Sequence, residues 1–94
     1  KFEKELKVLE NSLYVYYGKK PIFYLNEYNY YDYINKNFSN NIWIYSHGNI
    51  QPKTLDSKKC IWQYSTSGKC KGIKGYVDMN YFNGDLHEFK KFIK

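Results

Sequence analysis

Two short apolar segments, one helix length apart, most constrain what this chain can fold into. Residues 21–25 (PIFYL) and 41–46 (NIWIYS) have the composition of buried strands. Between them, Asn26 is suited to cap a helix. The expected apolar face of that helix comprises Tyr30, Tyr31, Ile34 and Phe38. A strand, a helix and a second strand form a crossover unit, so we predict an α/β fold with a partly parallel sheet.

Helices are expected at both ends of the chain. Apolar residues at spacings of three and four predict a first helix over residues 2–16, with Gly18 ending it. At the other end, Asp85 is suited to cap a last helix, and Glu88 completes a capping-box pattern. The apolar face of the last helix comprises Leu86, Phe89 and Ile93.

Two further strands are expected between the second strand and the last helix. Residues 60–65 (CIWQYS) alternate between apolar and polar, and residues 75–82 (GYVDMNYF) have the composition of a strand. Residues 66–75 contain three glycines and predict a turn or a wide hairpin, whereas residues 47–59 predict a long polar loop. Four strands with one helical crossover look like a section of a barrel that has been cut open.

The composition favours partners that carry negative charge. The chain has 94 residues, a formal net charge of +6 and 12 tyrosines. A positive charge attracts polyanions such as nucleic acid or the anionic bacterial cell wall. An AT-rich genome would also produce this Lys-, Asn- and Tyr-rich usage. Arginine is absent, and no nucleic-acid-binding motif is visible, so we do not expect nucleic acid as the partner.

The sequence gives no sign of a membrane span, a signal peptide or a bound cofactor. No apolar run approaches the roughly 20 residues that cross a membrane. Because the first residue is Lys1 rather than Met, we expect the chain to be cut from a longer protein. Cys60 and Cys70 are ten positions apart, which is not a metal-site spacing, and free thiols are favoured over a disulfide. No ligand cluster or phosphate-binding loop is present, so no metal or nucleotide cofactor is expected.

A specific pattern extends over residues 62–82. They read WQYSTSGKCKGIKGYVDMNYF and resemble WQYSxxGxxxGIxGxVDxNxF, the C-terminal signature of glycoside hydrolase family 25 lysozymes. Upstream, residues 20–24 (KPIFY) resemble the family's K-P-x-x-Y strand, and residues 42–44 (IWI) resemble its L-W-I strand. The resemblance covers nearly all of residues 1–94. It implies the C-terminal section of a modified TIM-like β/α barrel, with this chain supplying the fifth to eighth strands.

The resemblance also implies an activity and a cellular location. Family 25 lysozymes are N-acetylmuramidases, which hydrolyse the β-1,4 bond between N-acetylmuramic acid and N-acetylglucosamine in peptidoglycan, outside the cell or at the cell wall. Their catalytic acid is the Glu of a D-x-E motif after the fourth strand, and this chain contains no D-x-E. We therefore expect the isolated chain to be inactive. The alternatives are a non-catalytic glycan- or cell-wall-binding module, and a degenerate homologue of the enzyme.

The resemblance assigns roles to four residues of this sequence. Asp78 matches an active-site Asp of the family, and its neighbours Val77 and Met79 predict a place near the sheet interior. Tyr24 ends its strand, where barrel enzymes place their sites, and is expected to contact substrate. Trp62 is expected to stack on a sugar ring, and Gln63 to hydrogen-bond substrate. The alternatives are a structural Asp, a core tyrosine, a core tryptophan (either Trp43 or Trp62) and a glutamine bonded within the barrel.

Three other ionisable residues have simpler interpretations. Glu27 is expected in the first turn of a helix, where the helix dipole favours a carboxylate. His47 has no paired nucleophile or acid in the sequence, so a solvated loop histidine is favoured over a catalytic base. His87 is expected on the surface of the last helix. Finally, an open barrel section exposes two sheet edges, so we expect the chain to self-associate.

Overall fold

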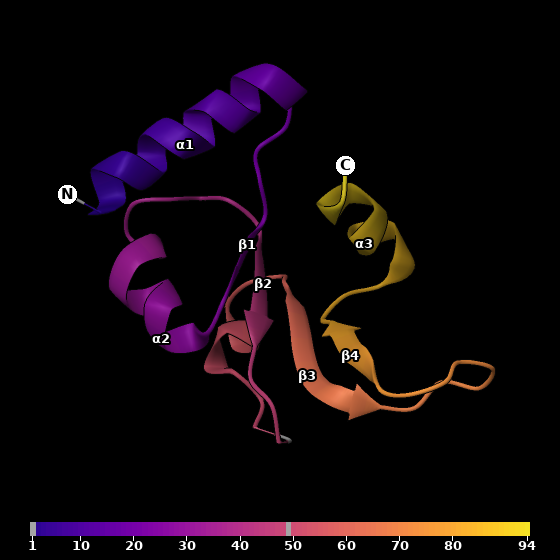
Figure 1. The fold of residues 1–94 in the computed structure, drawn as a ribbon. Helices are drawn as coiled ribbons and strands as arrows, with labels where there is room; N and C mark the ends of the chain where they lie inside the picture. The colour runs from indigo at the N-terminus through magenta and orange to yellow at the C-terminus, as the bar shows by residue number, and fades with distance from the viewer. Residues whose placement is uncertain (1, 49) are drawn as a thin grey trace.

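The computed structural model describes residues 2–48 and 50–94, which form a mixed α/β structure (Figure 1). Within this described part there are three α-helices, one π-helical turn, one 3₁₀ turn and four strands. In chain order they are α1 (Phe2–Tyr17), β1 (Phe23–Leu25), α2 (Glu27–Asn29), η1 (Tyr30–Ile34), β2 (Ile42–Tyr45), η2 (Lys53–Asp56), β3 (Ile61–Gly68), β4 (Val77–Phe82) and α3 (Leu86–Phe92).

The four strands form one sheet in the order β1-β2-β3-β4. The β1–β2 and β2–β3 pairs are parallel, and the β3–β4 pair is antiparallel. This arrangement confirms the predicted α/β class and the order of helices and strands. Strands β1 and β4 each have one neighbour among the described residues, so the sheet has two open edges.

The two faces of the sheet differ in what covers them. Side chains alternate between faces along a strand, and the register aligns residues of one parity across the sheet. One face, which we call the helix-covered face, carries Phe23, Leu25, Ile42, Ile44 and Trp62. The other, which we call the open face, carries Tyr24, Trp43, Tyr45, Gln63 and Asn80. At one end of the open face, the Phe82 ring packs against Phe89 and Phe92 of α3.

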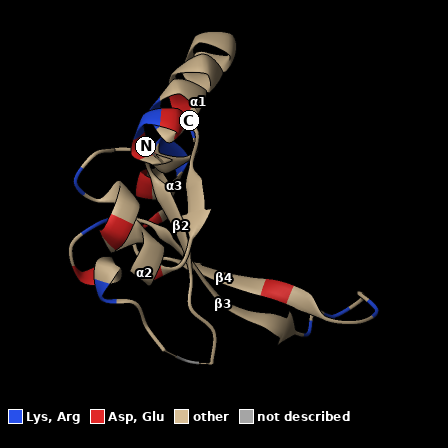
Figure 2. Ribbon diagram, turned by 60° about the vertical axis from the view of Figure 1, so that its left-hand side comes forward, with Lys and Arg blue, Asp and Glu red and all other residues tan. Residues whose placement is uncertain are grey.

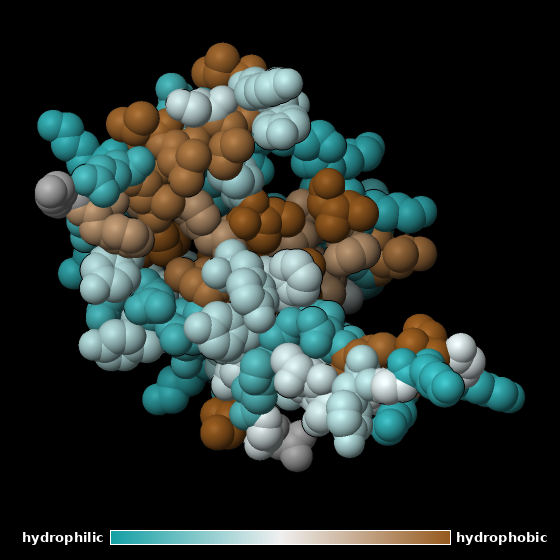
Figure 3. All heavy atoms as spheres, viewed as in Figure 1, coloured by the Kyte–Doolittle hydropathy of each residue, from teal (hydrophilic) through white to brown (hydrophobic). Residues whose placement is uncertain are grey.

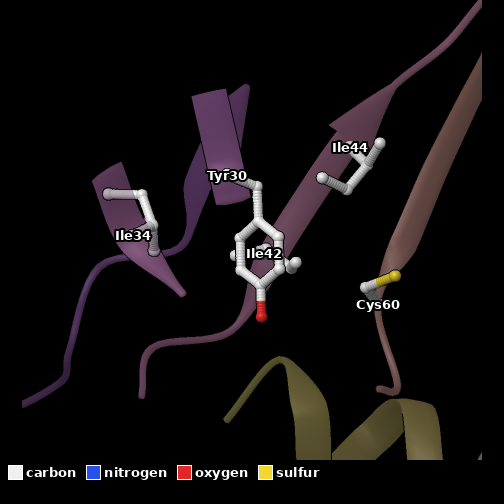
Figure 4. Close-up of a cluster of buried hydrophobic side chains, with 5 residues drawn as sticks. All are labelled: Tyr30, Ile34, Ile42, Ile44 and Cys60. Atoms are coloured by element: carbon white, nitrogen blue, oxygen red, sulfur yellow. The ribbon is translucent and has the colours of Figure 1, made fainter. Parts of the chain in front are cut away.

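The hydrophobic core lies under the helix-covered face. It consists of Tyr30 and Ile34 from η1, Ile42 and Ile44 from β2, and Cys60 just before β3 (Figure 4). Both isoleucines and Cys60 are completely buried. Partly buried residues complete this core: Leu6, Phe23, Leu25, Phe38 and Leu55. Because the core is small, single changes within it should strongly affect stability.

Helix α1 contributes little to this core. As predicted, it ends at Gly18, which has a φ of 71° and donates its backbone N–H to the Tyr14 carbonyl at 2.8 Å. No residue of α1 is fully buried. Apolar side chains therefore remain exposed on it, and Figure 3 shows brown spheres gathered over this end of the molecule. No helix among the described residues has the length and apolar character to cross a membrane.

The helix between β1 and β2 differs from the prediction. Asn26 caps it as expected, accepting a 2.8 Å hydrogen bond from the Asn29 backbone N–H. Only residues 27–29 are α-helical, and Tyr30–Ile34 continue as a π-turn closed by the Asn35 N–H and the Tyr30 carbonyl. Phe38 lies beyond the helix. Aromatic residues and Asn are weak helix formers, and packing of Tyr30 and Ile34 on the sheet determines the local winding instead.

The strand boundaries also shift relative to the prediction. Strand β1 begins at Phe23, β3 extends to Gly68, and β4 begins at Val77. Of the turn or wide hairpin expected over residues 66–75, the structure has the hairpin, and its first residues are paired with β4 or belong to β3. The predicted capping box is confirmed, because Asp85 and Glu88 each accept a hydrogen bond from the other's backbone N–H.

Two polar side chains anchor the segment between β2 and β3. The Glu27 carboxylate accepts hydrogen bonds from the Thr54 backbone N–H at 2.8 Å and the Thr54 hydroxyl at 2.7 Å. Asn83 donates to the carbonyls of Leu55 and Lys58 and accepts from the Cys60 N–H. Glu27 does lie in the first turn of α2, as predicted, and the structure adds a tertiary role that the sequence did not reveal.

The two cysteines are free thiols in different surroundings, since Cys60 is buried and Cys70 is exposed. Burial raises the pKa of Cys60 from 9.0 to about 11; the Lys58 charge opposes this rise and the Glu27 charge adds to it. A thiol whose pKa is higher in the folded chain than in the unfolded chain stabilises the fold fully at pH values below the pKa of the unfolded chain. That stabilisation is lost as the pH rises through the folded value.

We therefore expect stability to fall between pH 9 and pH 11. The thiol of Cys60 should contribute on the order of 2 kcal/mol to that loss. Urea unfolding at pH 8 and pH 11, in the presence of a reductant, measures it. The Cys60→Ala variant is the control, because it lacks the thiol and keeps every other titratable side chain. An equal loss of stability in both proteins would contradict this assignment.

Candidate functional site

A hydrogen-bonded cluster lies on the open face, near the C-terminal ends of the parallel strands. The Tyr24 hydroxyl donates to Gln63 Oε1 at 2.8 Å, and Gln63 Nε2 donates to Asp78 Oδ2 at 3.2 Å. His47 Nε2 lies 2.8 Å from the same Gln63 Oε1. Three side chains from different parts of the chain thus meet around the Gln63 amide, and we call these four residues the Gln63 cluster.

The topology of the sheet explains why these residues meet. Tyr24 is in β1, His47 follows β2, and Gln63 pairs with Tyr45 across the β2–β3 ladder. Strand β4 is antiparallel, so it begins where its parallel neighbours end, and this brings Asp78 to the same edge of the sheet. The carboxyl ends of parallel strands are where α/β barrels place their sites.

Gln63 is the fixed centre of the cluster. Gln63 is nearly buried, with 3% of its surface exposed, and its amide contacts the side chains of Tyr24, His47 and Asp78. Only the amide nitrogen can donate to the Asp78 carboxylate, so the amide oxygen faces Tyr24 and His47. His47 therefore donates from Nε2, and its Nδ1 is the ring nitrogen left to accept a proton or a ligand hydrogen bond.

Aromatic rings form one side of the site. The Tyr24 ring centroid lies 5.2 Å from that of Trp43 and 5.1 Å from that of Tyr45. The Trp43 indole N–H donates to Asn80 Oδ1 at 2.8 Å. A largely apolar hollow of about 400 Å³ adjoins Trp43 and Asn80. Rings beside fixed polar groups suit a sugar, because its faces are apolar and its edges carry hydroxyls.

Asp78 is exposed, and the prediction of a place near the sheet interior was wrong. Strand β4 is an edge strand, and Asp78 is the second residue of it, next to the hairpin. Its carboxylate is therefore solvated and available to a ligand as well as to Gln63. It is the one carboxylate of the Gln63 cluster, because Glu27 is engaged with Thr54 elsewhere.

The structure brings together three of the four residues expected at the site. Tyr24, Gln63 and Asp78 meet, but Trp62 lies in register with Ile44 on the helix-covered face, and its indole N–H donates to the Ser46 carbonyl at 2.8 Å. Between the two tryptophans, it is Trp43 that lies beside Tyr24. His47 was expected to be a solvated loop residue; it is exposed, but it belongs to the cluster.

The sequence contains a pattern that predicts a place for His47 and Trp43 on the same face as the site. Residues 43, 45 and 47 follow the period of two that places side chains on one face of a strand. Extending that alternation past the strand end would have placed His47 with Trp43 and Tyr45. No group of three or more potential metal-binding side chains occurs in residues 2–48 and 50–94.

Comparisons with known proteins identify relatives of this chain, but the names of these relatives state no activity. The chain is 34% identical over 89 residues to uncharacterized protein YegX of Escherichia coli strain K12, and 33% identical over 89 residues to its counterpart in Escherichia coli O157:H7. Each match covers 94% of this chain and 31% of the relative. The chain thus spans about a third of the length of these relatives. No protein-family model matches the chain, and no solved structure matches it.

Proposed function

We propose that this chain is the C-terminal section of a lysozyme-like β/α barrel and that the Gln63 cluster binds the glycan strand of peptidoglycan. The observation that carries the proposal is the chain of hydrogen bonds from Tyr24 through Gln63 to Asp78 on the open face. The same three residues occupy matching positions in the stretches that resemble family 25 lysozymes. The proposed enzyme is an N-acetylmuramidase that acts outside the cell or at the cell wall.

The chemistry of the cluster suits an N-acetylated sugar. Asp78 can accept a hydrogen bond from an acetamido N–H, and the Tyr24 hydroxyl oxygen, whose hydrogen is donated to Gln63, can accept one from a sugar hydroxyl. The rings of Tyr24 and Trp43 offer apolar surface to the sugar. Lysozymes of this family resemble enzymes in which the acetamido group itself attacks the anomeric carbon. In such a reaction, Asp78 orients and polarises that group.

Glycosidic bond cleavage also requires a protonated acid to assist the leaving group. The Gln63 cluster contains one carboxylate, so under this proposal the acid comes from another part of a longer protein. The relatives, which are about three times as long as this chain, have room for such a part. We accordingly propose that the 94-residue chain binds glycan without cleaving it.

The edge of the sheet at β1 has a surface on which further barrel strands could pack. A hollow of about 250 Å³ between α1, β1 and η1 is lined mostly by apolar side chains, including Phe2, Leu6 and Leu25. A strand added at this edge would pair with the open side of β1 and cover the hollow. This supports a barrel completed on the N-terminal side of the segment.

The second candidate is a glycan- or cell-wall-binding module without catalysis. The single carboxylate of the Gln63 cluster favours it, because ordinary glycoside hydrolysis uses two. The two candidates predict the same behaviour for this chain and differ for the longer protein. Muramidase activity of the longer protein that is lost on Asp78→Asn would support the enzyme, whereas activity unaffected by that change would exclude the proposed role of Asp78.

Glycan binding can be tested on the chain itself. Titration with a chitin tetrasaccharide, followed by two-dimensional NMR, should shift the signals of Tyr24, His47 and Asp78. The Gln63→Leu variant should bind at least about tenfold more weakly, because it leaves Tyr24, His47 and Asp78 without their shared partner. Trp62→Phe, on the other face, is the matched control and should bind as the wild type does. No shifts at the Gln63 cluster, or lysis of cell walls by this chain, would overturn the proposal.

Self-association is expected from the open sheet edges. Unpaired N–H and C=O groups along β1 and β4 can pair with a second copy of the chain. Light scattering should therefore give a mass above the monomer's 11.4 kDa that rises with concentration. Proline at Tyr24 should reduce association if the pairing runs along β1, because proline removes a backbone donor. A monomer at all concentrations would contradict this expectation.

A further inference from the structure

A second charged surface lies beside the Gln63 cluster, on the hairpin that joins β3 to β4. The last paired residues are Gly68 and Val77, so residues 69–76 form the excursion between the strands. Figure 1 shows this hairpin extending away from the body of the molecule. Figure 2 shows blue segments along this hairpin, and the lysines in residues 69–76 are Lys69, Lys71 and Lys74. We call residues 69–76 the lysine arm.

The backbone of the lysine arm is folded by local contacts. The Ile73 N–H donates to the Cys70 carbonyl at 3.0 Å, and Gly72 and Gly75 have φ values of 87° and 86°. These positive values favour glycine and turn the chain back on itself within a few residues. At the base of the arm, Lys69 Nζ lies 4.4 Å from the centroid of the Tyr76 ring. The three lysines therefore occupy a short, defined loop.

The positive charge of the arm is not neutralised within the chain. Residues 57–77 contain no Asp or Glu, and Lys69, Lys71 and Lys74 are exposed. In residues 2–48 and 50–94, an ion pair joins Lys59 to Glu88, and no ion pair involves the arm. Ile73 and Tyr76 are also exposed, at 55% and 69%, so the arm does not pack on the body. An uncompensated cluster of this kind attracts anionic ligands.

We propose that the lysine arm is a docking site for an anionic cell-wall polymer whose backbone carries phosphate groups, such as a polymer of glycerol phosphate. Lysine ammonium groups bind phosphate as point charges and do not require a particular orientation of the phosphate. The base of the arm adjoins Asp78, so a polymer bound there lies next to the glycan at the Gln63 cluster. The choice of a cell-wall polymer rests on the proposed function.

The structure of the arm disfavours nucleic acid as the ligand. Single-strand binders combine positive charge with aromatic rings on which bases stack. The arm contains one aromatic residue, Tyr76, and the Lys69 ammonium group lies over its ring. Phosphate contacts are therefore available without a stacking surface for bases. A polymer that offers phosphates alone fits this arrangement better than a nucleic acid does.

The test compares two triple variants of the 94-residue chain. The arm variant carries Lys69→Gln, Lys71→Gln and Lys74→Gln. The control carries Lys4→Gln, Lys36→Gln and Lys90→Gln, three exposed lysines elsewhere, and has the same net charge. Circular dichroism checks that both remain folded.

The probe is fluorescently labelled poly(glycerol phosphate), and anisotropy measures its binding. The arm variant should bind at least about tenfold more weakly than the wild type, and the control within about threefold of it. Binding by the wild type should weaken as salt is added. Equal losses in the two variants would overturn the proposal, because net charge alone would then explain binding. Tighter binding to single-stranded DNA of equal phosphate number would also overturn it.

The test of polymer binding by the lysine arm can be told apart from the test of glycan binding by the Gln63 cluster. The arm variant should bind the neutral chitin tetrasaccharide as the wild type does, because the Gln63 cluster is intact in it. If the tetrasaccharide fails to bind and the phosphate polymer still binds through the arm, the proposed glycan site is wrong and the polyanion site stands. If the polymer fails to bind the wild type, the lysine arm is not its docking site.

Discussion

Ile44→Ala is expected to destabilise the chain by about 3 kcal/mol, because it opens a cavity in a core that has few residues to fill it. Ile44 is completely buried and belongs to the core cluster with Tyr30, Ile34, Ile42 and Cys60. A domain of this size has a total stability of roughly 5–10 kcal/mol. The variant should therefore melt more than about 10 °C below the wild type.

Urea unfolding followed by circular dichroism measures this loss. The matched control is Ile73→Ala, in the lysine arm, where 55% of the side chain is exposed. That change should alter stability by about 0.5 kcal/mol or less. A loss below about 1 kcal/mol for Ile44→Ala would mean that the helix-covered face is not the core that holds the sheet.

Glu27→Ala is expected to lower the free energy of unfolding by about 3 kcal/mol, although Glu27 is outside the core cluster. Its carboxylate accepts two short hydrogen bonds from Thr54, and Thr54 is completely buried. Removing the acceptor leaves a buried N–H and a buried hydroxyl without a partner, which costs more than the net value of the lost bonds. The 3₁₀ turn η2 should then detach from α2.

Hydrogen exchange at the Thr54 amide reports this detachment directly. Glu27→Gln keeps an acceptor oxygen and should recover part of the lost stability. Glu5→Ala, an exposed change on α1, should alter stability by about 0.5 kcal/mol or less. Unchanged protection of the Thr54 amide in Glu27→Ala would show that the contact does not hold the turn.

Local sequence signals predicted most of the fold. The stop at Gly18, the cap at Asn26 and the capping box at Asp85 depend on a few adjacent residues, and all three form as predicted. The π-turn of η1 was not predicted, because it follows from packing of Tyr30 and Ile34 on strands distant in sequence.

The site was harder to predict because it depends on register between strands. Tyr24, Gln63 and Asp78 were chosen by resemblance, and the sheet brings them into contact. Which tryptophan would lie beside them depends on which parity faces away from the helices, and the sequence did not determine that. Asp78 was expected near the interior because its neighbours are apolar, but an edge strand leaves alternate residues in water.

The direction of the Gln63 amide decides what its neighbours can offer to a ligand. Because Gln63 Oε1 can only accept, both the Tyr24 hydroxyl and His47 Nε2 use a donor on it. The atoms left to face a ligand are therefore acceptors: the Tyr24 oxygen, His47 Nδ1 and the carboxylate of Asp78. A molecule rich in hydroxyl and amide N–H donors complements such a surface, whereas one that brings only acceptors does not.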